Sequence, residues 1–415
     1  MLQHIYLVPK GINQTDLLKF KGALIRANQT FKALEDLENE FNRTVLKRLN
    51  NTKICIHRDW LDYQQHAYNI KINQLCSDIG ISTSLSSDGL MHWLERQIVN
   101  DGQKFTTDLK YLTDNKHLHP LYEDLFALVK ANIFHKQWFS KLLPLVNKGM
   151  GLIEISGHWS SYTSYSGRVT ATNLSLTSLP NKMKAYVVPS KEDSTIWSID
   201  FNNAELRCVA YLSQDKQLLK DLTEGVDVHS VIGFMIMKVL NQSLTNNDYR
   251  KTAKTFIFAM LYGAGDTTLR NILVKKGLHA YVSDVLRLKQ LIFGRYSSLE
   301  AYFEQTVKRD WVDTFYGPIY PLITMSGPQK RNIAFQSMIA SALKLLAITC
   351  VRQKLEVINL IHDEVWVQVP NSTELNWQEH LEKQFTKIIL KNHPKFPVHG
   401  LLKMEKLEEK YNGKI

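Results

Sequence analysis

Hydrophobic residues recur at helical spacing through residues 1–150. The stretches FKALEDLENEFNRTVLKRL and HPLYEDLFALVKANIFHKQWFSKLL carry an apolar residue at about every third or fourth position, which is typical of helices with one buried face. Polar punctuation in SDIGISTSLSSDG breaks this pattern. This part of the chain is therefore predicted to be helical throughout.

The pattern changes in residues 156–180, where SGHWSSYTSYSGRVTATNLSLTSLP is rich in Ser, Thr and Gly and predicts extended loops. The next stretch, STIWSIDF, predicts a buried strand that ends in the carboxylate of Asp200. A helical block is predicted over about residues 204–312, and RNIAFQSMIASALKLLAITCV predicts a buried helix. The stretch EVINLIHDEVWVQVP then predicts two short strands around a tight turn at His362 and Asp363.

Two of these predicted strands end in an acid, and the two acids, Asp200 and Asp363, lie far apart in the sequence. An acid at the tip of an apolar strand must be paired, hydrated or bound to a metal ion, because burying a lone carboxylate is costly. One interpretation is two salt-bridged acids in the core. The other is a pair that converges on Mg²⁺, which prefers a few carboxylates together with water and substrate phosphates, as in-line phosphoryl transfer requires.

A cationic and aromatic stripe is predicted along RKTAKTFIFAMLYGAG, residues 250–265. Residues four apart share one face of a helix. The resulting line consists of Arg250, Lys254, Phe258 and Tyr262. The two cations suit triphosphate oxygens, and the two rings suit a flat base. The alternative is that the two rings simply belong to the core, as aromatic residues at helical spacing commonly do.

The sequence has 415 residues and a formal net charge of +11. This basic excess suits a polyanionic partner or an anionic membrane surface, and it is equally compatible with a solvated surface. The four cysteines form no CxxC pair, which argues against a zinc site or a disulfide framework and favours a reducing compartment. No apolar run approaches the roughly 18 residues of a membrane span, and MLQHIYLVPK lacks the features of a secretory signal. We therefore expect a cytoplasmic protein with no membrane partner.

Six short motifs resemble those of the polymerase region of family-A DNA polymerases, the bacterial repair and phage replicative type. They are SGR (166–168), DFNNAELR (200–207), DVH (227–229), RKTAKTFIFAMLYG (250–263), NIAFQS followed by Lys344, and HDE (362–364). One such tripeptide is a weak signal, but six in the family's order are a strong one. The resemblance implies an α+β fold, the right-hand polymerase fold with an antiparallel-sheet palm, helical fingers and a helical thumb.

The resemblance covers nearly the whole chain after about residue 35 and implies a domain organisation. The expected divisions are an N-terminal extension (1–34), the thumb and its preceding helices (35–150), the first part of the palm (151–225), the fingers (226–312) and the second part of the palm (313–415).

By position, the resemblance implies catalytic roles for Asp200, Asp363 and Lys254. The two acids would hold two Mg²⁺ ions, for which Mn²⁺ is expected to substitute. Glu364 would lie beside them as a weaker candidate ligand or as a support for the ligands. Lys254 would also help to protonate the departing pyrophosphate.

The resemblance also implies a set of residues that bind the incoming dNTP. They are Arg250, Lys254, His229, Phe258, Tyr262 and Glu205. The three basic residues would contact the triphosphate, Phe258 would lie against the nucleotide, and Tyr262 would stack at the template side. Glu205, packed against Tyr262, would occupy the space that a ribose 2′-OH needs and so select deoxynucleotides. The alternative for His229 is a residue at a helix N-terminus that binds no ligand.

Primer–template DNA is the macromolecular partner that the resemblance implies. A further set of residues would contact its minor groove near the growing primer end. The hydrogen-bond acceptors that the bases present in this groove are similar in all base pairs. This set is Arg168, Asn332, Gln336 and His362. The alternative for Gln336 is a side chain that is satisfied by the backbone.

A proofreading exonuclease needs about four carboxylates on two metal ions, opening with D-x-E on a strand. The D-x-E in this region, Asp36 to Glu38, lies in ALEDLENEF, whose periodicity predicts a solvated helix face. We therefore expect a monomer without proofreading or 5′-nuclease activity, served by a separate exonuclease or processivity factor. The Lys-, Asn- and Ile-rich composition favours a phage or mobile-element origin.

The expected function is template-directed DNA synthesis from a primer 3′ end by two-metal phosphoryl transfer. One alternative is an RNA polymerase or a primer-synthesising enzyme on the same palm, against which Glu205 beside Tyr262 argues. Another is a non-catalytic protein that binds primer–template DNA, against which the intact pair of Asp200 and Asp363 argues.

Overall fold

The structure is a computed structural model that describes residues 28–78, 112–113, 121–146, 151–161, 166–243, 246–309, 312–315, 317–319 and 326–411. The chain divides into two compact units, each built from segments that are distant in sequence. The first unit takes in Met1–Thr52, His158–Ser178 and Asp193–Lys410, and the second takes in Lys53–Gly157, Leu179–Glu192 and Tyr411–Ile415. Every predicted site residue falls in the first unit.

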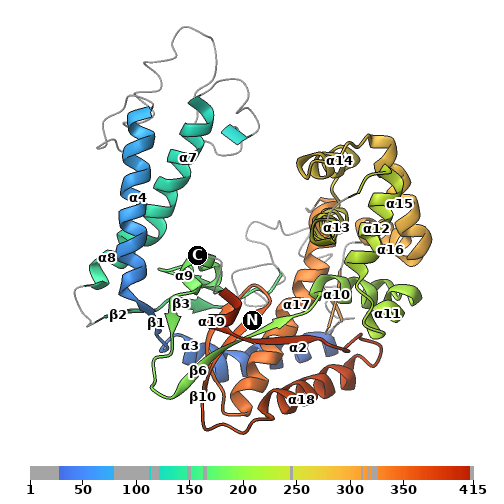
Figure 1. Ribbon diagram of the computed structural model, residues 1–415. Helices are drawn as coiled ribbons and strands as arrows, with labels where there is room; N and C mark the ends of the chain where they lie inside the picture. The colour runs from blue at the N-terminus through green and yellow to red at the C-terminus, as the bar shows by residue number, and fades with distance from the viewer. Residues whose placement is uncertain are drawn as a thin grey trace, which may run out of the picture. The chain divides into compact units, whose positions relative to one another are not determined.

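A four-stranded antiparallel sheet forms the frame of the first unit (Figure 1). Its order is β11–β6–β10–β9, with β6 at Ser194–Phe201, β9 at Glu356–Ile361, β10 at Glu364–Pro370 and β11 at Leu402–Lys406. All residues of β10 except the last are buried, which explains the nearly continuous apolar run in its sequence. The predicted strands at STIWSIDF and on both sides of the His362–Asp363 turn are confirmed.

The long helix α17 (Gly327–Arg352) packs on this sheet and against α18 (Trp377–Asn392). Ser326 and Gln329 form a capping box at its start, with Pro328 in the first turn, so the predicted buried helix begins where its sequence favours one. Within the described part of the chain, α17 alone is long and apolar enough to cross a membrane. Since 89% of its apolar window is buried inside the protein, α17 is a core helix.

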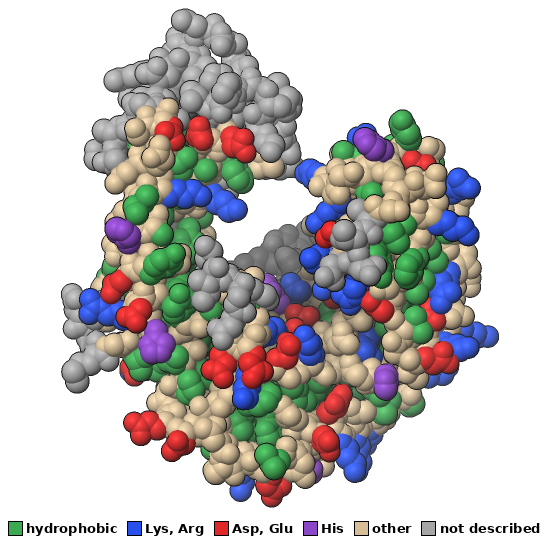
Figure 2. All heavy atoms as spheres, viewed as in Figure 1, with side chains coloured by type: hydrophobic (Ala, Val, Ile, Leu, Met, Phe, Trp, Pro, Cys, Tyr) green, Lys and Arg blue, Asp and Glu red, His purple; other side chains and the backbone are tan. Residues whose placement is uncertain are grey.

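The helical block predicted over residues 204–312 is present from Ala204 to Lys308. It consists of α10 (Ala204–Ser213), α11 (Lys216–Thr223), α12 (Val228–Leu240), α13 (Asn246–Leu261), α14 (Asp266–Lys275), α15 (Val282–Arg295) and α16 (Ser298–Lys308). A short hairpin of β7 (Val312–Thr314) and β8 (Gly317–Ile319) follows it. Basic and acidic side chains are interspersed on the visible face of these helices (Figure 2).

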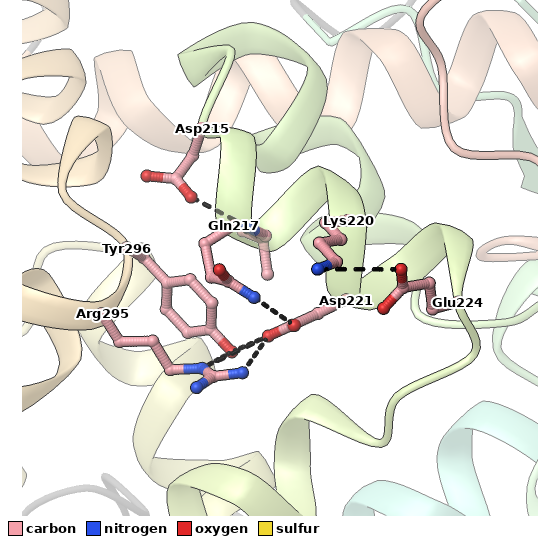
Figure 3. A network of polar contacts seen from close by, with 8 residues as sticks. Asp215, Gln217, Lys220, Asp221, Glu224, Arg295 and Tyr296 are labelled. Atoms are coloured by element: carbon pink, nitrogen blue, oxygen red, sulfur yellow. Dashed lines mark hydrogen bonds and ion pairs between the residues drawn. The ribbon is translucent and has the colours of Figure 1, made fainter.

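A polar network holds α11 against the corner between α15 and α16 (Figure 3). Buried Asp221 accepts hydrogen bonds from Arg295 Nη2 at 2.8 Å and from Tyr296 Oη at 3.0 Å. Asp215, the N-cap residue of α11, accepts one bond from the backbone of α11 and another from Ser298 N at 2.8 Å. The same carboxylate therefore satisfies the first turns of two helices, which stabilises their relative placement.

One side chain fastens the loop that leads into β11. Buried Arg207 on α10 donates to the carbonyl oxygens of Pro397 (2.6 Å), His399 (2.8 Å) and Gly400 (3.1 Å), and also to that of Asn202 (2.6 Å). The loop has no regular structure of its own, so these bonds satisfy carbonyl groups that secondary structure leaves open. The Arg207 guanidinium thus fixes the approach of the edge strand β11 to β6.

The Ser- and Thr-rich segment of residues 156–180 differs from the predicted extended loops. It contains a two-stranded hairpin of β3 (His158–Ser160) and β4 (Thr170–Thr172), followed by the 3₁₀ helix η4 (Leu176–Ser178). The prediction of an extended chain was correct, but the prediction of loops was wrong in these strands. Trp159 and Ala171, which face each other across the hairpin, are buried and give it an apolar side.

The helix α2 (Asn28–Phe41), the first within the described residues, carries Asp36 and Glu38 and continues through η2 (Asn42–Leu46) and α3 (Lys47–Leu49). The sequence predicted this helix correctly. It also predicted that Asp36 and Glu38 lie on a solvent-exposed face, and this prediction was wrong for Glu38. Its side chain is buried and pairs with the buried ammonium group of Lys344 on α17. Periodicity within α2 could not show this, because the burial is supplied by a helix some 300 residues later in the chain.

The second unit contains a three-stranded antiparallel sheet of order β2–β1–β5. Its strands are β1 (Ile54–His57), β2 (Leu152–Ile155) and β5 (Val187–Val188), and its helices are α4 (Arg58–Asp78), α7 (Leu121–Phe134), η3 (His135–Phe139), α8 (Ser140–Val146) and α9 (Asn181–Lys184). The prediction of helix throughout residues 1–150 was therefore wrong at β1. Four residues are too few for a visible period, and strands from other segments supply the pairing. Most of SDIGISTSLSSDG lies outside the described residues.

Candidate active site

The antiparallel pairing of β6 and β10 brings the two predicted acids to one end of the sheet. Asp200 is the second-last residue of β6, and its partner in the register is Glu364, the first residue of β10. Asp363 precedes Glu364 in the two-residue turn, and its carbonyl oxygen accepts a bond from Phe201 N at 3.3 Å. His362 takes the other turn position with a left-handed φ of 53°, which is uncommon for a residue other than Gly.

The Asp363 carboxyl group lies in a crowded, negatively charged environment. Burial, together with the nearby charges of Asp200 and Glu205, raises its pKa to about 7. A divalent cation would relieve this repulsion, and hard oxygen donors are the ligands that Mg²⁺ prefers. The described residues contain no cluster of three or more metal-binding side chains, so the pair forms an open donor set. Such a set fits an ion that also takes water and phosphate oxygens.

A lysine from the C-terminal helix α19 (Leu407–Tyr411) completes this cluster. Lys410 Nζ lies 3.1 Å from Asp200 Oδ2 and 3.3 Å from Glu364 Oε1, and it donates to Ser198 Oγ at 2.9 Å. Glu364 also accepts bonds from Ser198 and from the indole of Trp366. Burial disfavours the ammonium form, but the Glu364 and Asp200 carboxylates outweigh it and raise the pKa of Lys410.

The predicted stripe lies along α13, with Tyr262 just beyond its last residue. Arg250 and Lys254 are exposed, whereas Phe258 and Tyr262 are half-buried. Lys254 Nζ lies 5.7 Å from the centre of the Phe258 ring, within cation–π range. The opposite face of the helix, with Ala253, Phe256, Ile257 and Met260, is buried. The helix therefore presents its two cations to solvent and anchors its rings partly in the protein.

Asp227, the N-cap residue of α12, is the present partner of Arg250. Its Oδ2 accepts bonds from Arg250 Nε at 2.7 Å and from Ser230 Oγ at 2.7 Å. Burial opposes ionisation of Asp227, but the bonds from Arg250 and Ser230 outweigh it and lower its pKa. Arg250 is thus held at the start of α12 by a partly exposed ion pair.

His229 is buried on the first turn of α12, and neither of its ring nitrogens has a hydrogen-bond partner among the described residues. Burial and the positive charge of Arg250 lower its pKa to about 4. At neutral pH the ring is therefore uncharged and has one N–H to donate. The ring centre lies 5.7 Å from that of Phe258, which places it beside the stripe.

Glu205 and Tyr262 are in contact, as the family resemblance implied. The Tyr262 hydroxyl donates to Glu205 Oε1 at 3.3 Å. Burial raises the pKa of Tyr262 strongly, and the charges of Glu205 and Asp363 act in the same direction, while that of Arg168 opposes them. Tyr262, at the end of the α13 stripe, therefore lies close enough to Glu205 and Asp363 for their charges to act on its hydroxyl group.

The four residues predicted to contact DNA all belong to the first unit. Gln336 and Asn332 stand one turn apart on α17, and the Gln336 amide donates to Asn332 Oδ1 at 2.5 Å, so Gln336 is satisfied by a side chain. Arg168 is half-buried, and its Nε lacks a partner within the part of the chain that is described. His362 is exposed at the turn beside Asp363.

Two charged side chains at this site were missed by the sequence reasoning. Lys410 contacts Asp200 from 210 residues away, and no pattern in LLKMEKLEEKY distinguishes it from its lysine neighbours. The sequence gives Asp227 only as the first residue of DVH, although a carboxylate two positions before a histidine, at a predicted helix start, is a usable signal.

Comparisons with known proteins show which family and which fold this chain resembles. DNA polymerase I of Borreliella burgdorferi is 22% identical over 383 residues, which are 84% of this chain and 41% of the relative. DNA polymerase I of Streptococcus pneumoniae is 26% identical over 248 residues, 52% of this chain and 27% of the relative. The chain thus spans less than half the length of these relatives.

Among solved structures, the POL domain of Pol1 from M. smegmatis, in complex with a DNA primer-template and dNTP, matches with a TM-score of 0.72. It is 19% identical, and the match covers 93% of this chain and 72% of that one, which confirms the α+β polymerase fold. The family model of DNA polymerase family A matches residues 47–399. Because that match takes in most of the sequence, this chain belongs to DNA polymerase family A.

Proposed function

We propose that this chain is a DNA-directed DNA polymerase that adds deoxynucleotides to a primer 3′ end as a template directs. The observation that carries the proposal is the convergence of Asp200 and Asp363 at one end of the sheet, which follows from the pairing of β6 with β10. Primer–template DNA and a dNTP are the molecules bound in the M. smegmatis POL domain, whose fold this chain shares. Both are the partners proposed here.

Two divalent ions, Mg²⁺ or Mn²⁺, would be held by Asp200 and Asp363, with Glu364 supporting them. When bound, such ions supply a more acidic primer hydroxyl and neutralise charge on the phosphates. The two carboxylates approach each other because β6 and β10 are paired, so the protein supplies a fixed donor geometry before substrate arrives.

The exposed cations of α13 would bind the triphosphate of the incoming dNTP. Lys254 and Arg250 are separated by one helical turn, and Lys254 can deliver a proton to the departing pyrophosphate. Arg250 must first leave Asp227, or share its charge with the phosphates. His229, being neutral, would donate a hydrogen bond without adding charge.

Phe258 and Tyr262 would contact the nucleotide and the template side, and the rotation of α13 would close the site on a correct pair. Arg168, Asn332, Gln336 and His362 would contact the minor groove of the primer–template. In this proposal, the sheet with β6 and β10 is the palm (residues 151–225 and 313–415), residues 226–312 are the fingers, and residues 35–150 hold the thumb.

Wild-type protein is expected to extend a labelled primer with dNTPs and to reject ribonucleotides. Glu205→Ala should raise the relative use of ribonucleotides by roughly 10-fold or more, because it opens the space beside Tyr262 that a 2′-OH needs. Single-nucleotide incorporation with a dNTP and the matching NTP measures this ratio. Glu224→Ala, which removes an exposed acid at the end of α11, is the matched control. Wild-type preference for ribonucleotides would instead favour an RNA polymerase.

We further propose that this chain does not proofread. The supporting observation is that Asp36 and Glu38 lie on a helix and that Lys344 neutralises Glu38. A labelled primer with a mismatched 3′ end should keep its length when incubated with Mg²⁺ and no dNTP, and its shortening would contradict the proposal. A cytoplasmic protein of phage or mobile-element replication remains the proposed setting, supported by the Lys-, Asn- and Ile-rich composition.

A further inference from the structure

A partly buried ammonium group already contacts one oxygen of the candidate metal ligand Asp200. The Lys410 side chain is 13% exposed, and its Nζ lies 3.1 Å from Asp200 Oδ2. The same nitrogen lies 3.3 Å from Glu364 Oε1, whose side chain is 7% exposed. Lys410 therefore compensates two carboxylates at once in a partly dehydrated site, where charge interactions are stronger than at the surface.

The two carboxylates depend on Lys410 to different degrees. Glu364 keeps hydrogen bonds from Ser198 and from Trp366, and these hold its orientation independently of Lys410. The Asp200 side chain accepts its hydrogen bond from Lys410 Nζ and is 33% exposed. Asp200 is thus the carboxylate whose availability Lys410 controls.

We propose that Lys410 is a tethered cation that competes with divalent metal ions for Asp200 and so sets the metal concentration at which the site fills. The inference rests on the proposed function, since it takes Asp200 as a metal ligand. Two physical effects act together. The ammonium group shares the oxygen that an ion would bind, and its charge repels a second cation placed nearby.

The geometry of β11 explains why the competitor is always present. Lys410 follows β11 by four residues, and β11 pairs along β6 through Asp200 itself. Because the lysine is part of the same folded unit, its effective concentration at Asp200 is high and constant. A free metal ion must displace it, whereas a nucleotide brings negative phosphates that compensate the displaced ammonium. Metal binding is therefore expected to be weak in the free protein and stronger with a dNTP.

The test is a titration of the protein with Mn²⁺, followed by electron paramagnetic resonance, without DNA or nucleotide. Lys410→Met should lower the Kd for Mn²⁺ by roughly 10-fold relative to wild type, because it removes the competing charge. Lys410→Gln also removes the charge and should likewise lower the Kd for Mn²⁺. It provides the test if Lys410→Met does not fold. Lys410→Arg, which keeps the charge, should stay near wild type.

The matched control is Lys406→Met, which removes the same charge from the end of β11, where Lys406 faces Glu409 at 3.6 Å. Its Kd should equal that of wild type. In the double variant Asp200→Asn with Lys410→Met, the tighter binding should disappear.

An unchanged or raised Kd in both Lys410→Met and Lys410→Gln would overturn the inference, since Lys410 would then support metal binding or be indifferent to it. Primer extension by the wild-type protein decides the proposed function separately. If the wild-type protein extends the primer normally and the Kd for Mn²⁺ is unchanged in the two Lys410 variants, only the proposed role of Lys410 is wrong. Absence of extension, with Mn²⁺ binding that is insensitive to Asp200→Asn, defeats both.

Discussion

Replacing Asp363 by Asn is expected to slow primer extension by at least about 10³-fold, because it removes a charged donor that stabilises the transition state. Asn fills nearly the same space, so the β9–β10 turn should keep its shape. The substitution also removes a carboxylate whose pKa is raised to about 7 by burial and by Asp200 and Glu205, so the metal-free fold should not suffer. The measurement is single-turnover extension with Mg²⁺ and saturating dNTP.

The control for this experiment is Asp193→Asn. Asp193 is exposed and immediately precedes β6, at the end of the strand away from Asp200, so its loss should leave extension unchanged. Binding of primer–template DNA, followed by fluorescence anisotropy, should stay close to wild type in both variants. Equal extension by Asp363→Asn and wild type would defeat the assignment of Asp363 as a metal ligand, and a non-catalytic DNA-binding protein would then be the better interpretation.

Lys344→Met is expected to lower the free energy of unfolding by about 3–5 kcal/mol, because it leaves a buried Glu38 carboxylate without its partner. Both side chains are at most 5% exposed, so water cannot replace the lost ammonium group. Burial lowers the pKa of Lys344, while the charge of Glu38 raises it, which shows how closely the two ions depend on each other. Urea unfolding followed by circular dichroism measures the change.

Two further variants separate this effect from the loss of packing. Glu38→Leu combined with Lys344→Met should recover most of the loss, since apolar pairs commonly replace buried ion pairs without a penalty. Arg352→Met removes an ion pair with Glu40 between the same two helices, α2 and α17, at an exposed position, and should change stability by less than about 1 kcal/mol. A loss in Arg352→Met as large as that in Lys344→Met would show that burial is not the cause.

Local patterns in the sequence were sufficient for part of the site. The line of Arg250, Lys254, Phe258 and Tyr262 follows from helical spacing alone, and the structure places the first three on α13 and Tyr262 just beyond its end. Each strand that carries an acid could be identified from its own residues. The register that brings Asp200 beside Glu364 could not, because it depends on two segments 164 residues apart, and there the family resemblance supplied the expectation.

The features that the sequence did not predict all depend on distant contacts. Glu38 reads as solvent-exposed in its own helix and becomes buried only through α17. The strand β1 has four residues and becomes a strand by pairing with β2 and β5. Lys410 is one of several lysines near the C-terminus, and only the pairing of β11 with β6 selects it. Contacts with distant segments determine the structure at these positions, and neither the propensity nor the periodicity of each segment predicts it.

The guanidinium of Arg207, with its bonds to four carbonyl oxygens, has a consequence for how genetic variation in this chain is interpreted. Lysine cannot reproduce this forked set of hydrogen-bond donors. The conservative substitution Arg207→Lys would therefore release the segment ahead of β11. Because Lys410 follows β11, it would move away from Asp200 as well. A mutational scan scored on growth would then rank Arg207 among the most intolerant positions, beside the acids. That intolerance would reflect the loss of the bonds that hold the segment ahead of β11, and it would not indicate contact with substrate.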